Sequence, residues 1–333
     1  MLTSDLIERI LTRLPGKTIG LVGDLFLDRY LDIDAALDEP SVETGLTAYQ
    51  VTGVRSYPGA LGTVVNNLEA LGVGRIVPIS IVGDDGEGYE LLQALAELPA
   101  VDTSHVIRSG ERRTPTYTKP MLREGGTVRE LNRLDIKNRT PTPVELQKRI
   151  GDSLAESWPA FDALLVLDQV SEADCGVITA HLRDFIGLGA GRSPLFILAD
   201  SRELIGEFRN VCVKPNAAEA EWWVPGGDPR KLAELVKGPV LLTRAEAGIA
   251  LAEVGDSEVR MIPAYPISGP VDPCGAGDSC SAAIACAMAS GTSLEVAAAF
   301  GNLIASITVR QLGVTGTAPP DAVRARWREL GNA

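Results

Sequence analysis

A carboxylate directly follows a Gly-Ala-Gly turn in the segment 271–279, VDPCGAGDS. The turn consists of Gly275, Ala276 and Gly277. A helix is expected over 279–290, and the unpaired backbone N–H groups of its first turn favour an anion at a start this poor in side chains. Asp278 would repel that anion unless it takes part in the chemistry. We interpret Asp278 as a general base that takes the proton of a substrate hydroxyl while the N–H groups stabilise a transferred phosphoryl group.

The same segment also has a purely structural explanation. Acidic residues are common in the first turn of a helix and need no ligand there. Taken alone, the segment leaves both explanations open, so the rest of the chain has to decide between them.

The composition limits the classes of function. The chain has 333 residues, of which 45% are hydrophobic, enough for one large α/β domain or two smaller ones. The net charge of -13 and the lack of a Lys/Arg run argue against a nucleic-acid surface. Only two histidines occur, which disfavours His-based triads and His-rich metal sites. Acid and base chemistry is therefore expected from carboxylates.

The expected compartment is the cytoplasm. The five cysteines include no C-x-x-C pair, which is typical of a reducing environment. Asp5 and Glu8 lie in an amphipathic stretch near the N-terminus, and no uncharged apolar run reaches the length of a membrane span. The sequence therefore predicts neither secretion nor insertion into a membrane.

Short β-branched or Leu-rich runs alternate with helical patterns along most of the chain. The expected buried strands are 18–23, 75–82, 163–167, 195–199, 211–214 and 240–243, and 249–253 with 258–263 looks like an edge hairpin. The expected helices are 4–14, 62–71, 86–98, 144–156, 173–185, 279–290 and 294–312. This alternation predicts an α/β fold with a doubly wound, mostly parallel sheet and helices on both faces.

Two stretches, 31–58 and 111–135, interrupt the alternation. Their patterns look like strands of a small sheet set apart from the main one. A sheet inserted in this way could close over a site as a lid. Long surface loops are the alternative, although loops of this length are uncommon in compact domains.

Polar residues follow the expected first strand. Asp24 and Asp28 lie where ligands bind in an open parallel sheet, and a carboxylate accepts two hydroxyl hydrogen bonds, as a polyol offers. An aspartate that caps a loop is the alternative for either residue. The segment lacks G-x-G-x-x-G, so a dinucleotide site is disfavoured.

Three further segments carry weaker signals. The segment 57–67, YPGALGTVVNN, puts glycines at a helix start, where backbone can approach a ligand or simply turn. Asn216 and Glu219 form an Asn-x-x-Glu pattern that a capping box explains fully without ligand. Thr243 and Gly248, at the end of the next strand, could border a nucleotide.

The order of these motifs resembles the ribokinase-like (PfkB) sugar kinase family across nearly the whole chain. The order runs from Gly-Asp after strand one, through a Gly-rich helix start, the turn 82–88, Asn-x-x-Glu and Thr-x-x-x-x-Gly, to Asp-x-x-Gly-Ala-Gly-Asp. The segments 23–30, 57–59 and 134–135 look like the heptose-phosphate kinase branch.

The resemblance implies a Rossmann-like domain with a small β lid, ATP and Mg²⁺ as cofactors, and transfer of the γ-phosphoryl group to a sugar hydroxyl. Asp278 matches the family's base, and the Gly-Ala-Gly turn matches its anion hole. The implied ATP-side residues are Asn216, Glu219, Thr243, Gly248 and Asn302, with Glu219 acting indirectly on Mg²⁺. The expected substrate-side residues are Asp24, Asp28, Gly59, Thr63, Asn67 and Gln169. Lid sheets in this family often pair two subunits, so a homodimer through the lid is also implied.

Several family motifs are altered. The family's Gly-Gly-x-x-Asn reads here as 59–63, GALGT, so Thr63 stands in place of the sugar-binding Asn. The branch's Asp-Tyr-x-Lys-Gly is replaced by 169–173, QVSEA, and its Asp-Pro-Lys by 200–202, DSR. The Thr beside the anion hole is displaced by Pro273-Cys274. All but the last lie on the acceptor side, so the chemistry looks retained while the acceptor remains open.

The sequence therefore predicts an ATP-dependent kinase of a sugar or sugar phosphate. Three alternatives remain: a kinase of a nucleoside or other small alcohol, a catalytically weak regulator that binds sugar, and a pure interaction protein. A pure interaction protein would not need a helix start this poor in side chains. Retention of Asp278, Asn216 and Glu219 argues against the regulator.

Overall fold

The computed structural model of the protein describes residues 2–331. Within this range, nine strands form one sheet in the order β16-β15-β14-β13-β12-β11-β1-β6-β7. Its strands are β1 (Thr18–Gly23), β6 (Arg75–Gly83), β7 (Val106–Ser109), β11 (Ala163–Asp168), β12 (Phe196–Ser201), β13 (Cys212–Val213), β14 (Val240–Thr243), β15 (Ile249–Ala252) and β16 (Arg260–Ile262). The pairs from β14 back to β7 are parallel, whereas β14–β15 and β15–β16 are antiparallel.

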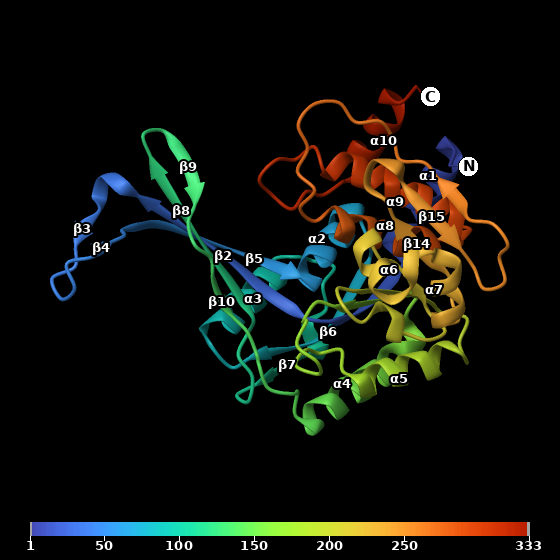
Figure 1. The fold of residues 1–333 in the computed structure, drawn as a ribbon, viewed down its shortest axis with the longest axis horizontal. Helices are drawn as coiled ribbons and strands as arrows, with labels where there is room; N and C mark the ends of the chain where they lie inside the picture. The colour runs from blue at the N-terminus through green and yellow to red at the C-terminus, as the bar shows by residue number, and fades with distance from the viewer. Residues whose placement is uncertain (1, 332–333) are drawn as a thin grey trace.

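Helices cover both faces of this sheet (Figure 1). One face packs against α1 (Ser4–Arg13), α2 (Leu61–Leu71), α3 (Gly86–Ala96), α8 (Ala276–Ala289), α9 (Leu294–Thr308) and α10 (Pro320–Glu329). The other packs against α4 (Val144–Ser157), α5 (Ala180–Ala190), α6 (Ala217–Trp223) and α7 (Pro229–Val236). Successive side chains of the buried strands point to opposite faces and pack in two hydrophobic cores, for example Leu165 on one face and Val166 on the other. The predicted α/β fold is confirmed.

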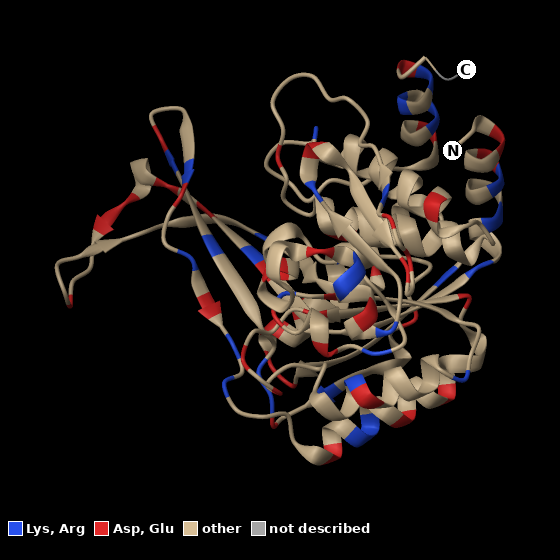
Figure 2. Cartoon of the chain, turned by 45° about the vertical axis from the view of Figure 1, so that its right-hand side comes forward, with Lys and Arg blue, Asp and Glu red and all other residues tan. Residues whose placement is uncertain are grey.

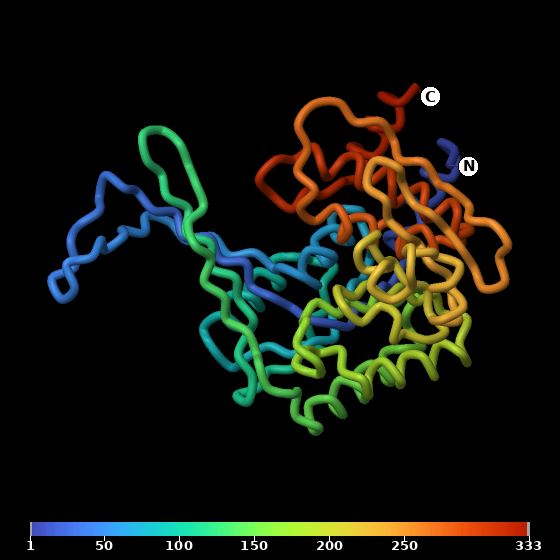
Figure 3. Tube along the Cα trace, viewed as in Figure 1, coloured from blue at the N-terminus to red at the C-terminus, as the bar shows by residue number. Residues whose placement is uncertain are grey.

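A second sheet projects from this body, as the chain trace shows clearly (Figure 3). It contains β2 (Leu25–Asp34), β5 (Val51–Ala60), β8 (Thr116–Glu124), β9 (Thr127–Glu130) and β10 (Leu134–Ile136) in the order β10-β8-β2-β5, with β9 on β8. The short ribbon β3 (Glu39–Pro40) and β4 (Thr47–Ala48) extends it. We call β2, β5, β8, β9 and β10 the lid sheet; that it closes over a site stays a prediction.

One expected helix is wrong in position. The pattern predicts a helix over 173–185, but α5 begins at Ala180. The residues before it are held in irregular backbone: Asp174 has a φ of 56°, its carboxylate accepts the N–H of Ala180, and the N–H of Val177 is bound by Asp24. Thr179 then caps the helix by accepting the N–H of Leu182.

Candidate active site

The Gly-Ala-Gly turn forms the start of α8. Gly275 is the N-cap, with a φ of 75° and no side-chain cap, and a Cβ there would lie 3.3 Å from Thr315. The N–H of Ala276 is bound by the carbonyl of Pro273. Within residues 2–331, no acceptor takes the N–H of Gly277 or of Asp278. Unpaired donors at the positive end of a long helix form an anion site.

Asp278 lies partly exposed in this first turn. Burial, and then the negative charge of Asp200, raise its pKa to about 7. The cations of Lys214 and Arg202 act in the opposite direction. A carboxylate with a pKa near the operating pH is suited to general base catalysis.

An ion pair that the sequence analysis missed lies beneath this turn. The Nζ of Lys214, at the end of β13, is 2.8 Å from Oδ2 of Asp200 on β12, and the side chains are only 4% and 13% exposed. Arg202, which stands where the branch has its lysine, donates from Nε to Oε1 of Gln169. The only signal in the sequence was a lysine directly before Pro-Asn at a strand end.

The nucleotide-side candidates come together at the ends of β13, β14 and β16. Asn216 and Glu219 form a capping box: Asn216 Oδ1 accepts the N–H of Glu219, and Glu219 Oε2 accepts the N–H of Asn216 at 2.7 Å. Asn216 also bridges to Thr243. Gly248 has a φ of 90°, and a Cβ there would lie 2.1 Å from the carbonyl oxygen of Ile262.

The side-chain amide of Asn302 is hydrogen-bonded to the backbone. Its Nδ2 donates to the carbonyls of Ile262 and Pro263 at 3.1 and 3.0 Å. It therefore fixes the segment that follows β16, and any contact with nucleotide would be made by the backbone it positions or by its Oδ1.

Asp28 and Gly59 meet on adjacent strands of the lid sheet. Asp28 pairs with Tyr57 in the β2–β5 register, and a Cβ on Gly59 would lie 2.9 Å from the Asp28 carboxylate. Lys119 Nζ is 3.6 Å from Asp28 Oδ2 and donates to the hydroxyl of Tyr30 at 3.1 Å. Burial raises the pKa of Asp28, and the Lys119 ammonium lowers it in part. The lid thus offers a carboxylate and an ammonium side by side.

Asp24 is bound to the backbone, and its expected contact with a polyol stays a prediction. It is 4% exposed, and its two oxygens accept the N–H groups of Val177 at 2.7 Å and Gln169 at 3.2 Å. Asp24 therefore anchors the segment 169–177 to the end of β1. Burial raises its pKa to about 6.

Thr63 and Asn67 lie inside the molecule on α2. Thr63 is buried beside the anion-hole turn, with its methyl 3.5 Å from where a Cβ on Gly275 would lie. Asn67 donates to the carbonyl of Thr63, and its Oδ1 is buried without a partner among the described residues. Thr63 thus borders the turn, whereas Asn67 lies one helical turn further from it.

A small cavity of about 30 Å³ lies where the lid sheet meets the main sheet. Its lining includes Asp24, Phe26, Arg112, Tyr117, Gln169 and Glu172. Glu172, which stands near the branch's missing lysine, lies 3.4 Å from the guanidinium of Arg139 and 4.0 Å from Lys137. Its charge is therefore balanced by two neighbouring cations.

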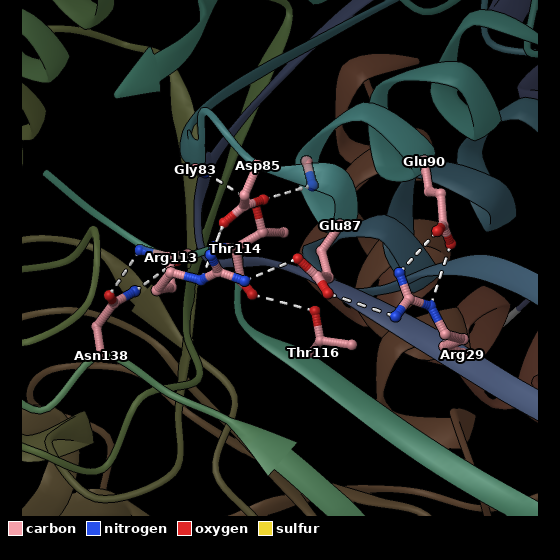
Figure 4. A network of polar contacts seen from close by, with 10 residues as sticks. Arg29, Gly83, Asp85, Glu87, Glu90, Arg113, Thr114, Thr116 and Asn138 are labelled. Atoms are coloured by element: carbon pink, nitrogen blue, oxygen red, sulfur yellow. Dashed lines mark hydrogen bonds and ion pairs between the residues drawn. The ribbon is translucent and has the colours of Figure 1, made fainter. Parts of the chain in front are cut away.

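A polar network joins the lid sheet to α3 (Figure 4). Arg29 on β2 donates to Glu90 and Glu87 at 2.7 and 3.4 Å, and Arg113 donates to Glu87 at 2.9 Å. Asp85 caps α3 and also accepts the N–H and the hydroxyl of Thr114, which precedes β8. These contacts fix the base of the lid sheet on the main body.

Charges of both signs are interspersed over the chain (Figure 2), and none of the described helices is long and apolar enough to cross a membrane. The sequence pattern of the family described as "pfkB family carbohydrate kinase" matches residues 26–321. The chain belongs to this family. The family's description names carbohydrate kinases, the class that the motif order predicts.

Relatives and solved structures agree with this assignment. The chain is 29% identical over 332 residues to the "Bifunctional protein HldE" of Trichlorobacter lovleyi and 29% over 331 residues to that of Pelobacter propionicus. Each comparison covers 96% of this chain but 65% of the relative's length.

Two structures share the fold. The ribokinase of Arabidopsis thaliana, complexed with ribose and ATP, has a TM-score of 0.65 at 16% identity, covering 93% of this chain and 98% of that one. Phosphofructokinase-2 of Escherichia coli, in complex with substrates and products, has a TM-score of 0.68 at 16% identity, covering 95% and 99%. The predicted ribokinase-like fold is confirmed.

Proposed function

We propose that this kinase moves the γ-phosphoryl group of ATP to a hydroxyl of a sugar or sugar phosphate, with Asp278 as the general base. One observation carries the proposal: the Asp278 carboxylate, with a pKa raised to about 7, stands beside the unpaired N–H groups of Gly277 and Asp278 at the start of α8. Proton acceptor and anion donors thus occupy one helical turn.

Residues at the start of α8 would perform the chemistry, and residues of the lid sheet would orient the acceptor. Asp278 takes the proton of the attacking hydroxyl, and the N–H groups of the first turn stabilise the negative charge that develops on the transferred group. Asp28 and the backbone at Gly59 orient the acceptor's hydroxyls from the lid side. Closure of the lid sheet would exclude water from the transfer.

ATP would lie along the ends of β13, β14 and β16. Its γ-phosphate supplies the transferred group, and Mg²⁺ neutralises the phosphate charge when bound. Among residues 2–331 no group of three or more metal-ligating side chains gathers, which fits a hydrated Mg²⁺ held largely by phosphates. Glu219 has one carboxylate oxygen that is not used by the capping box and can accept from water around the ion. Thr243 and Gly248 would border the nucleotide.

Two alternatives to the sugar acceptor differ in what they require. A nucleoside or other small alcohol also offers a hydroxyl to Asp278, so the same base and anion donors would serve it. A regulator that binds sugar without turnover would leave Asp278 without a task. Screening sugars, sugar phosphates and nucleosides for acceptor-dependent ADP release separates these cases.

The variant Asp278→Asn tests the base. The amide is isosteric but cannot accept the proton, so we expect kcat to fall by about 10²- to 10⁴-fold while ATP binding and the melting temperature are nearly unchanged. Asp321→Asn is the matched control, because Asp321 is also in the first turn of a helix, α10, and is almost fully exposed. An Asp278→Asn enzyme that keeps more than half of the wild-type kcat would remove Asp278 from the base role.

We also propose a homodimer formed through the lid sheet. The lid residues Val54 and Leu134 are exposed apolar side chains, and the β2–β5, β2–β8 and β8–β10 registers put them on one face. This face is opposite to the one that carries Asp28.

A further inference from the structure

The ion pair of Asp200 and Lys214 is deeply buried. Besides Lys214 Nζ at 2.8 Å, Asp200 Oδ2 has the hydroxyl of Ser281 at 3.3 Å. Replacing a buried ion pair by apolar residues of similar volume is often neutral or stabilising, so stability alone gives little reason to keep one. The pair invites a functional explanation.

The pair lies directly under the proposed anion hole. Lys214 Nζ is 3.7 Å from the point where a Cβ on Gly277 would lie. Ser281, one turn along α8, has its Oγ within 3.1 Å of the Gly277 carbonyl as well as near Asp200. Three elements, β12, β13 and α8, thus converge on the turn that carries Asp278.

We propose that Asp200 and Lys214 are a positioning pair that sets the charge state of Asp278 by opposing electrostatic effects from beneath the anion hole. The inference rests on the proposed role of Asp278 as the base. Neither residue touches the reacting atoms; both act through Asp278.

The charges facing Asp278 define the direction of each effect. Asp200 disfavours the carboxylate form, whereas Lys214 and Arg202 favour it. The Cys280 thiol on α8 and the Glu219 carboxylate on α6 lie in the same field, since Lys214 and Asp200 act on both of them. On the acceptor side, Cys274 is close enough to feel both Asp278 and the Asp28–Lys119 pair. Of the two ion pairs among these groups, that of Lys214 and Asp200 is shorter and more buried than that of Lys119 and Asp28.

The pair therefore predicts opposite outcomes for its two members. Removing the Lys214 charge leaves Asp278 facing Asp200, so Asp278 should hold its proton to higher pH. Removing the Asp200 charge leaves Asp278 facing Lys214, so Asp278 should lose its proton at lower pH. A purely structural pair would damage the protein in both cases without moving the titration in opposite directions.

The experiment follows the Asp278 carboxyl directly, since this readout needs no acceptor. In protein labelled with ¹³C at aspartate carboxyls, the Asp278 signal is identified by its loss in Asp278→Asn. We expect Lys214→Met to move its titration midpoint upward and Asp200→Asn to move it downward, each by roughly one pH unit. Lys237→Met, at an exposed helix end, is the control and should leave the midpoint unchanged.

The second readout is the pH profile of ADP release with the best acceptor from the screen. Its rising limb should move with the NMR midpoint, upward in Lys214→Met and downward in Asp200→Asn. If Lys214→Met fails to fold because it leaves Asp200 buried without its cation, the isosteric Asp200→Asn variant decides alone. Midpoints that stay in place, or that move in the same direction in both variants, overturn the inference. An active Asp278→Asn enzyme would instead overturn the base role and leave the NMR result intact, so the two failures are distinguishable.

Discussion

Asp28 and Gly59 show how one residue makes room for another. The Asp28 carboxylate occupies the space over Gly59 that a side chain would need, because it lies 2.9 Å from the position that a Cβ on residue 59 would take. That distance is shorter than real Cβ contacts, so any side chain at position 59 must displace the carboxylate. The glycine is therefore required by its neighbour across the strands, independently of any turn.

Gly59→Ala is expected to raise the KM for the acceptor about tenfold or more, because displacing Asp28 leaves acceptor hydroxyls unpaired at roughly 1–3 kcal/mol each. The KM for ATP should change little, since the nucleotide side is formed by other strands. The measurement is steady-state kinetics with each substrate varied. Gly53→Ala is the control on the same strand, where a Cβ would meet Asp32 at an ordinary 3.4 Å. An equal rise in both KM values would argue against a local effect on Asp28.

Glu219 has two proposed roles, capping α6 and contacting hydrated Mg²⁺, and two substitutions can separate them. Glu219→Gln keeps an oxygen that can accept the N–H of Asn216, so the capping box and the melting temperature should be preserved. The Mg²⁺ concentration for half-maximal activity should rise, because the free carboxylate oxygen is lost. Glu219→Ala provides the comparison, with an added stability loss of about 0.5–2 kcal/mol from the missing cap. Unchanged Mg²⁺ dependence in Glu219→Gln would leave capping as the residue's whole role.

At the scale of elements, the strands and most helices follow from hydrophobic period, since β1, β6, β11 and β14 appear close to where buried runs predict them. The helix predicted over 173–185 begins only at Ala180, and the hydrophobic pattern contains no signal of the reason. Asp24, about 150 positions earlier in the chain, binds the backbone at 169 and 177 and keeps that segment out of the helix. A helical pattern of side chains was overridden by a tertiary contact to the backbone.

The lid sheet depends on α3 for its position. Arg29 is mostly buried between Glu87 and Glu90 (Figure 4). Ser56 on β5 donates to the same Glu90 at 2.7 Å. Arg29→Met should lower stability by about 1.5–3 kcal/mol, since it removes charge-assisted hydrogen bonds and leaves two acidic side chains unpaired.

The effect of Arg29→Met should be local, and hydrogen exchange is the measurement. Amides of β2 and β5 should exchange faster while those of the main sheet stay protected. Arg55→Met is the control on the same lid sheet, because its ion pair with Asp32 is exposed and worth about 0–1 kcal/mol. Uniformly faster exchange would mean that the network supports the whole fold rather than the lid.

For the whole molecule, the motif order identified the family, but the site's electrostatics could not be predicted from sequence. Asp278, Asn216 and Glu219 were selected because motifs mark them. Lys214 and Asp200 were not, because a lysine and an aspartate 14 positions apart meet only when β12 and β13 lie parallel in the sheet. The contacts of Asp24 could not be predicted from the sequence either, because its burial and its backbone partners depend on the loop after β11.

Val54 is 57% exposed on the face of the lid sheet opposite Asp28, and Leu31 on the neighbouring strand shares that face. Exposed apolar side chains on a projecting sheet favour pairing with a second copy. We expect the wild-type protein to sediment as a dimer at micromolar concentration and Val54→Asp as a monomer, because burying an unpaired carboxylate in an apolar interface is unfavourable.

The control for this assembly is Val254→Asp. Val254 is 52% exposed, similar to Val54, but it lies in the hairpin between β15 and β16, on the main body. This variant should remain dimeric if the lid sheet forms the interface. A wild-type protein that sediments as a monomer, or a Val254→Asp variant that dissociates while Val54→Asp does not, would exclude the lid as the contact surface. Since the opposite face of the same sheet holds Asp28, a dimer formed here would also stiffen the strands that orient the acceptor, and Val54→Asp should then raise the acceptor KM without changing the KM for ATP.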